Sequence, residues 1–145
     1  MPGPPRGMPI GRQLASTAKE VSRAFGEALA DAGGSEHVWL ILLALKTREN
    51  ANQRALAAAV GIQGATLTHH LNGMEESGLV RRRRDPRNRR IQVVELTAEG
   101  DAAFHRMRAA AVAFDERLRG DLSDDDLECV GAVLARLRAN VARES

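Results

Sequence analysis

The chain has 145 residues, which is typical of one domain or two, and its 21 basic and 19 acidic side chains leave a formal net charge of +2. This near-balance conceals a strong segregation, because the stretch from Arg81 to Arg90 holds seven arginines and one aspartate, a local charge of +6. The other residues therefore sum to −4, with five acids between Asp121 and Glu128. Charge this polarised indicates an anionic partner at one place on the molecule, and a phosphate backbone is one candidate.

Composition excludes several classes of protein. The longest apolar run, Val38 to Leu45, has eight residues, whereas roughly 18 to 20 are needed to span a bilayer. The N-terminus has no apolar segment typical of a signal peptide, so we expect a cytoplasmic protein with no membrane partner. A single cysteine, Cys129, excludes an internal disulfide framework and a cysteine-based zinc finger. With 43% hydrophobic and only 3% aromatic residues, the core is expected to be aliphatic.

The N-terminal third of the chain predicts an arm and two helices. Residues 1–9 hold four of the five prolines and are expected to form a disordered arm. From Ile10 to Ala32 apolar residues recur every three or four positions, which predicts an amphipathic helix that ends at Gly33. Ser35 is suited to cap a second helix over 35–47, which is apolar nearly all round and should lie at the centre of the core.

Two short helices and a hairpin are predicted next. Asn52 is a candidate cap for a helix through Ala59 that ends at Gly61, and a second helix runs from about Gln63 to Ser77. The core-facing row of that second helix is Leu67, Leu71 and Met74. Two runs of strand character, 79–84 and 90–96, are joined by a connection with a proline and an asparagine, which predicts a β-hairpin.

Two further helices complete the predicted fold. Thr97 is expected to cap a helix to about Arg119, and Ser123 a last helix with three aspartates in its first turn. The apolar residues of the last helix are spaced by three and four, which is typical of a seam that packs on a partner helix: Leu127, Val130, Leu134, Leu137 and Val141. The predicted fold class is therefore mostly α with a small β-hairpin.

Two short helices joined by a tight glycine-containing turn and followed by a basic hairpin form a winged helix-turn-helix, which we place at 33–96. The second helix of such a pair lies in the major groove of DNA, where short polar side chains read base edges. The candidate DNA contacts on that helix are Gln63, Ala65, Thr66, Thr68, His69 and His70, and the candidate DNA contacts on the helix before it are Asn52, Gln53 and Arg54. Arginine suits the negative potential of the minor groove and the phosphates, and the candidates on the wing are Arg82, Arg84, Arg87, Arg89 and Arg90.

Other interpretations of these residues stay open. A basic winged helix can coat or bend DNA without sequence preference, or bind an acidic partner protein. No metal site or cofactor is expected, because His69 and His70 diverge by about 100° on a helix and no Cys, Asp or Glu nearby completes a site. No motif of an enzyme is found, and the acids Glu75 and Glu76 are interpreted as structural. A redox role of Cys129 is open, although a lone cysteine more often packs as a small hydrophobic residue.

Several segments resemble the MarR family of transcriptional regulators: Asn52–Gly61, Thr66–Thr68, Met74–Val80, Arg84–Arg90 and Leu96–Gly100. The resemblance implies a homodimer, with residues 10–32 and 97–145 as the helical dimerisation region. It also implies a repressor that binds a palindromic operator in double-stranded DNA and is released by a small molecule, often aromatic, or by an oxidant. The family places its effector pocket where the first, second and fifth helices meet the DNA-binding lobe, which makes His37, Trp39 and Arg48 candidates.

The wing departs from the family pattern at one position. The family usually carries Asp-x-Arg there, and its aspartate holds the arginine that enters the minor groove. Here Asn88 occupies the aspartate position before Arg90, and Asp85 lies three residues earlier. We expect Asp85 and Asn88 to shape the wing, with Asn88 accepting a hydrogen bond from Arg90 without the charge assistance of a carboxylate.

Overall fold

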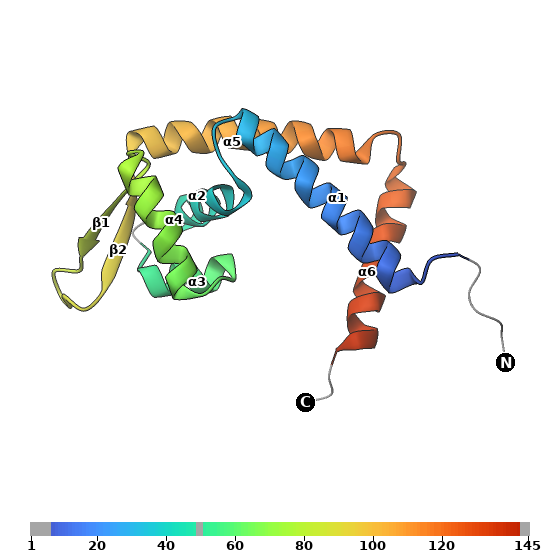
Figure 1. The fold of residues 1–145 in the computed structure, drawn as a ribbon, viewed down its shortest axis with the longest axis horizontal. Coiled ribbons are helices and arrows are strands. Elements are labelled where there is room, and N and C mark those ends of the chain that lie inside the picture. The colour runs from blue at the N-terminus through green and yellow to red at the C-terminus, as the bar shows by residue number, and fades with distance from the viewer. Residues whose placement is uncertain (1–6, 49–50, 143–145) are drawn as a thin grey trace. The chain divides into compact units, whose positions relative to one another are not determined.

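The computed structural model describes residues 7–48 and 51–142, so most of the arm predicted at 1–9 lies outside the described residues. The described chain forms six helices and one two-stranded antiparallel sheet (Figure 1), which confirms the predicted fold class. The elements are α1 (Ile10–Asp31), α2 (Glu36–Thr47), α3 (Gln53–Val60), α4 (Gly64–Glu76), β1 (Val80–Arg84), β2 (Gln92–Leu96), α5 (Ala98–Arg119) and α6 (Asp124–Val141).

The chain divides within α5 into two compact units, one ending at Ala111 and one beginning at Val112. The first unit holds α1 to α4, the hairpin and the first part of α5. The second unit holds the end of α5 and α6, in which no residue is buried. No single described helix is long and apolar enough to cross a bilayer; α1 and α2 pass that test only together, and they are bent by 73° at the break between them.

Hydrogen-bonded caps set the starts of four helices, and all four caps are the predicted ones. The side-chain oxygens of Ser35, Asn52, Thr97 and Ser123 each accept a hydrogen bond from the backbone N–H three residues further on, at 2.7 to 3.2 Å. These bonds satisfy donors that the first turn of a helix leaves free. The last helix has a full capping box, because the Asp126 carboxylate also accepts from the backbone N–H of Ser123 at 3.0 Å.

The turn between α3 and α4 is made possible by glycine. Gly61 ends α3 with a φ of 78°, in the left-handed region that costs other residues energy. Its N–H and that of Ile62 both donate to the carbonyl of Ala57, at 2.9 and 3.1 Å, which closes the end of α3. The chain is thereby redirected into α4 within three residues of the end of α3.

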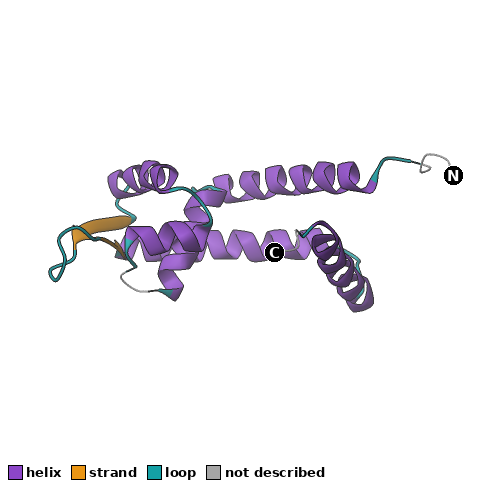
Figure 2. Ribbon diagram, turned by 90° about the horizontal axis from the view of Figure 1, so that it is seen from below, coloured by secondary structure: helices purple, strands orange, loops and turns teal. Residues whose placement is uncertain are grey.

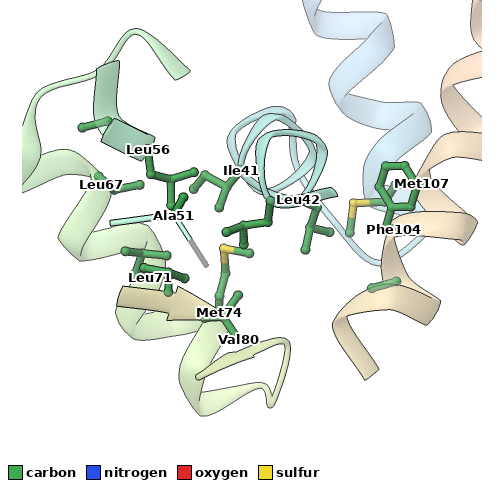
Figure 3. Close-up of a cluster of buried hydrophobic side chains, with 14 of the residues drawn as sticks. Ile41, Leu42, Ala51, Leu56, Leu67, Leu71, Met74, Val80, Phe104 and Met107 are labelled. Carbon is green, nitrogen blue, oxygen red and sulfur yellow. The ribbon is translucent and has the colours of Figure 1, made fainter. Parts of the chain in front are cut away.

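The core of the first unit is built around α2 (Figure 3). Ile41 and Leu42 are fully buried, as predicted for the central helix. The predicted inward row of α4 is also buried and faces them, and Leu29 of α1 and Met107 of α5 belong to the same cluster. This packing fixes α3 and α4 against one side of α2 and leaves their other sides to solvent.

The two strands form a hairpin (Figure 2). Val80 pairs with Leu96 at its base and Arg84 with Gln92 at its tip. It is anchored to the segment just before α3, since the N–H of Val94 donates to the carbonyl of Ala51 at 2.9 Å. The prediction that the second strand begins at 90 is wrong by two residues. The N–H of Ile91 instead donates to the carbonyl of Asn88 at 2.9 Å, so Ile91 belongs to the turn and the connection runs from 85 to 91.

The hairpin and α5 meet at Gly100, which is buried. A Cβ atom there would collide with the carbonyl oxygen of Leu79 and lie 2.7 Å from Cδ1 of Leu96. We therefore expect Gly100→Ala to lower the free energy of unfolding by about 1 to 3 kcal/mol, because the backbone of a packed junction must shift. Urea denaturation followed by circular dichroism measures this change.

The control for this substitution is Gly73→Ala in the interior of α4. A Cβ atom at Gly73 meets no atom within 4 Å, so helix propensity alone should stabilise this variant by up to about 1 kcal/mol. Equal denaturation midpoints for the two variants would contradict the packing argument.

Candidate nucleic-acid interface

α4 turns a row of short side chains to solvent. Ala65, Thr66 and His69 are exposed, and so is Gln63 at the N-cap, whose side chain makes no capping hydrogen bond. These residues lie opposite the predicted core-facing row of Leu67, Leu71 and Met74, and Thr68 and His70 are half-buried on the flanks. Hydroxyl, imidazole and amide groups on one exposed side of a helix can donate to and accept from base edges.

Thr68 and Gln53 are bonded to each other. Gln53 Nε2 donates to Thr68 Oγ1 at 2.7 Å, and this hydroxyl donates to the carbonyl of Gly64 at 3.0 Å. The pair links the start of α3 to α4. The Asn52 side chain is engaged as the cap of α3. Of the three candidates at the start of α3, Asn52 and Gln53 are half-buried and Arg54 is exposed.

His70 stacks on His37 of α2, with ring centroids 4.6 Å apart and planes inclined by 18°, and His69 approaches it edge-on at 5.6 Å. Partial burial lowers the pKa of His70, and the neighbouring His37 and His69 lower it further. His37, a candidate for the effector pocket, therefore contacts α4. No group of three or more His, Cys, Asp or Glu side chains in the described residues is placed to hold a metal ion.

The other effector-pocket candidates contact different neighbours. Trp39 is half-buried and stacks on Phe104 of α5, with centroids 5.5 Å apart, and Arg48 is exposed just after α2. A cavity of about 440 Å³ lies at the C-terminal end of α2 and is lined by residues of α2, β2 and α5. Lys46 and Asp101 are among them, and their charged groups are 2.6 Å apart. The structure thus brings His37, Trp39 and Arg48 to three separate surroundings, and their role in an effector pocket stays a prediction.

The arginines of β1 lie on two faces of the hairpin. Arg81 and Arg83 share one face, on which Arg83 Nε donates to Glu95 Oε1 at 2.6 Å. Arg82 and Arg84 share the other face, which also carries the buried Val94. Arg82 is bonded to α4, and Arg84 Nη1 donates to the carbonyl of Arg89 at 2.9 Å, across the wing loop.

The tip of the wing, residues 85–91, is held by two side-chain turns. Asp85 Oδ1 accepts from the backbone N–H of Arg87 at 2.8 Å, and Asn88 Oδ1 accepts from that of Arg90 at 3.1 Å. Asn88 therefore bonds the backbone of Arg90 and not its guanidinium. The guanidinium groups of Arg87, Arg89 and Arg90 are exposed and have no ion pair or hydrogen bond within the described part of the chain.

α6 leaves its single cysteine open to solvent. Cys129, expected to pack as a small hydrophobic residue, is exposed in the single chain.

The acids Glu75 and Glu76, interpreted as structural, end α4, and Glu75 is bonded to Arg82. Local sequence spacing does not indicate the partner of Glu75, although strand alternation from the buried Val80 places Arg82 on the core side of β1.

A pair of helices joined by a glycine turn, an exposed polar row on the second helix and an adjoining arginine-rich hairpin define a winged helix-turn-helix protein. The model of the MarR family matches residues 35–92. The chain is 37% identical over 90 residues to the transcriptional regulator HosA of Escherichia coli O111:H-, a match that covers 62% of this chain and 67% of HosA. It is 31% identical over 101 residues to the HTH-type transcriptional regulator YdgJ of Bacillus subtilis, covering 70% of this chain and 62% of YdgJ.

Solved structures agree with these relatives. The transcriptional repressor CouR, bound to a 23-mer DNA duplex, superposes with a TM-score of 0.80 at 26% identity, covering 89% of this chain and 92% of CouR. CouR of Rhodococcus jostii RHA1 bound to p-coumaroyl-CoA superposes with a TM-score of 0.73, covering 93% and 95%. The chain belongs to the MarR family of transcriptional regulators.

The lowered pKa of His70 predicts a dependence of stability on pH. Because the folded chain binds this proton less readily than the unfolded chain, the free energy of unfolding should fall as the pH drops below about 6.5, the ordinary pKa of histidine. His70→Phe keeps a ring against His37 and removes the titrating group, so its stability should fall less between pH 7.5 and pH 5.5. Urea denaturation of both proteins at the two pH values measures this difference, and equal losses would contradict it.

Proposed function

We propose that this protein is a homodimeric, sequence-specific transcriptional repressor that binds a palindromic operator in double-stranded DNA and is released by a small aromatic effector. The observation that carries the proposal is the adjacency of the exposed polar row of α4 to a wing whose three tip arginines are free. The DNA duplex bound to CouR supports the same use of this fold.

In this proposal α4 is the recognition helix. Gln63, Thr66 and His69 read base edges in the major groove, and Ala65 permits close approach of the helix. Arg87, Arg89 and Arg90 bind phosphates and the minor groove beside it, where arginine is favoured by the negative potential. Thr68 and Gln53 contribute to DNA binding as a pair, because the side chain of Gln53 already donates a hydrogen bond to that of Thr68.

The dimer is supported by apolar side chains that the single chain leaves exposed. On α1, Ile10 and Leu14 are 63% and 41% exposed, and on α6, Val130 and Leu134 are 49% and 39% exposed. Exposed apolar rows of this kind mark protein–protein interfaces. A two-fold axis would present two copies of α4 to half-sites about 34 to 36 Å apart, one turn of DNA.

The effector is supported by the family and by the ligand of CouR, p-coumaroyl-CoA, whose p-coumaroyl group is aromatic. We propose that His37, Trp39 and Arg48 contact the effector from three separate surroundings, His37 beside α4, Trp39 beside Phe104 of α5 and Arg48 just after α2. The relatives are transcriptional regulators, and we propose that this chain is likewise no enzyme, needs no cofactor and acts in the cytoplasm.

Selection of bound duplexes from a random pool should yield a palindromic consensus. On that cognate site, Thr66→Ala or His69→Ala should cost about 1 to 3 kcal/mol of binding free energy, with little change on random DNA, because each removes a base contact. Arg90→Ala should weaken binding to both duplexes and lower the salt slope by about one, because it removes a phosphate or groove contact. Fluorescence anisotropy titrations at several salt concentrations measure all three variants.

The rival functions give other outcomes in the same titrations. An architectural protein that coats DNA would lose cognate and random binding equally in every variant and would select no consensus. A wild-type protein with no affinity for any duplex at low salt would leave only a protein-interaction module.

Light scattering at micromolar concentration should give the mass of a dimer. Leu134→Asp places a charge in the exposed apolar row of α6 and should shift the protein to monomer, because an unpaired charge at an interface is costly. Arg136→Asp, at a polar position of the same helix, is the control and should remain dimeric. A monomeric wild type would contradict the dimer.

A further inference from the structure

We propose that Arg82 does not contact DNA but positions the wing, by locking β1 onto the recognition helix so that both meet the duplex in one fixed orientation. The proposal rests on the DNA-binding function proposed above and deepens it. It assigns different roles to arginines that look alike in the sequence.

Arg82 makes three hydrogen bonds to α4. Its Nη2 donates to Asn72 Oδ1 at 2.6 Å and to Glu75 Oε1 at 3.1 Å. Its backbone N–H donates to the other carboxylate oxygen of Glu75 at 3.1 Å. One carboxylate therefore holds both the strand and the side chain of the same residue, which restrains the distance and the rotation of β1 relative to α4.

The side chain is placed for this contact by the register of the hairpin. Arg82 pairs with Val94, which is fully buried, so both side chains lie on the core side of the sheet. The Arg82 side chain is only 19% exposed. To reach a phosphate it would have to leave an amide and a carboxylate, whereas Arg87, Arg89 and Arg90 have no bond to break.

Electrostatics agrees with this geometry. The hydrogen bonds from Arg82 lower the pKa of Glu75, because they favour the ionised form of its carboxyl group. The pair is then close to neutral as a unit, and Arg82 contributes little net positive charge toward DNA. Asn72 and Glu75 are three residues apart on α4, so they lie on the same side of the helix and form one docking point for β1.

The two roles predict opposite effects of Glu75→Gln. If Arg82 bound a phosphate, removal of the carboxylate would free the guanidinium, delete a negative charge and tighten DNA binding. If Arg82 positions the wing, the same change weakens binding to the cognate duplex, as Arg82→Ala does. The double variant should then bind no more weakly than Arg82→Ala alone, because the side-chain contact is shared and the amide oxygen introduced by Glu75→Gln can still accept from the backbone N–H of residue 82.

The test uses anisotropy titrations of the full chain with the selected duplex at several salt concentrations. Arg82→Ala should lower the affinity on the order of tenfold, the equivalent of one lost charge-assisted hydrogen bond, with the salt slope unchanged. Arg90→Ala is the matched control and should lower the salt slope by about one. A lowered slope in Arg82→Ala, or tighter binding by Glu75→Gln, overturns the proposal.

A readout without DNA separates this inference from the proposed function and from misfolding. In an NMR titration, the Glu75 carboxyl should titrate below its ordinary range in the wild type and within that range in Arg82→Ala, whose urea denaturation shows whether it is folded. An ordinary Glu75 titration in the wild type overturns the positioning role alone. A wild type that binds no duplex instead overturns the proposed function, and with it the role of Arg82 on DNA.

Discussion

The burial of α2 is the constraint on which the rest of the first unit depends. This helix has almost no polar side, so the chain must cover it on several sides, and it does so with α1, α3, α4 and the start of α5. One side of α4 is buried against α2 through Leu67, Leu71 and Met74. The opposite side of α4 is thereby left to solvent, and the exposed row that we propose to read DNA exists because the buried row is needed by α2.

The hairpin likewise has a core side and an opposite side, and its arginines are divided between them. Side chains of a strand alternate between two faces, and the core side of this hairpin is claimed by Val80 and Val94. Arg82 lies on that side and is bonded to Asn72 and Glu75, while Arg83 is paired across the sheet with Glu95. The basic run is therefore not one uniform charge. Arg82 and Arg83 hold the hairpin in place through their hydrogen bonds, and the arginines beyond Asp85 are free to meet a partner.

Several features of the site follow from the sequence with a clear physical reason. The four helix caps were predictable because Ser, Thr and Asn before an apolar-periodic run satisfy free backbone donors. The exposed row of α4 was predictable because the helical repeat fixes which residues lie opposite Leu67 and Leu71. The extent of the wing loop was not, because Ile91 has the composition of a strand residue and only its hydrogen bond to Asn88 places it in the turn.

By itself the sequence determined the order and type of the elements, the buried row of each amphipathic helix and the position of the basic segment, because these depend on local periodicity and composition. Tertiary structure alone decided which polar side chains are engaged inside the protein and which are free. Gln53 meets Thr68 fifteen residues away, His37 meets His70 across two helices, and Arg82 meets Asn72 and Glu75 across a turn. Such pairs depend on the packing angles of whole elements, which local spacing does not encode.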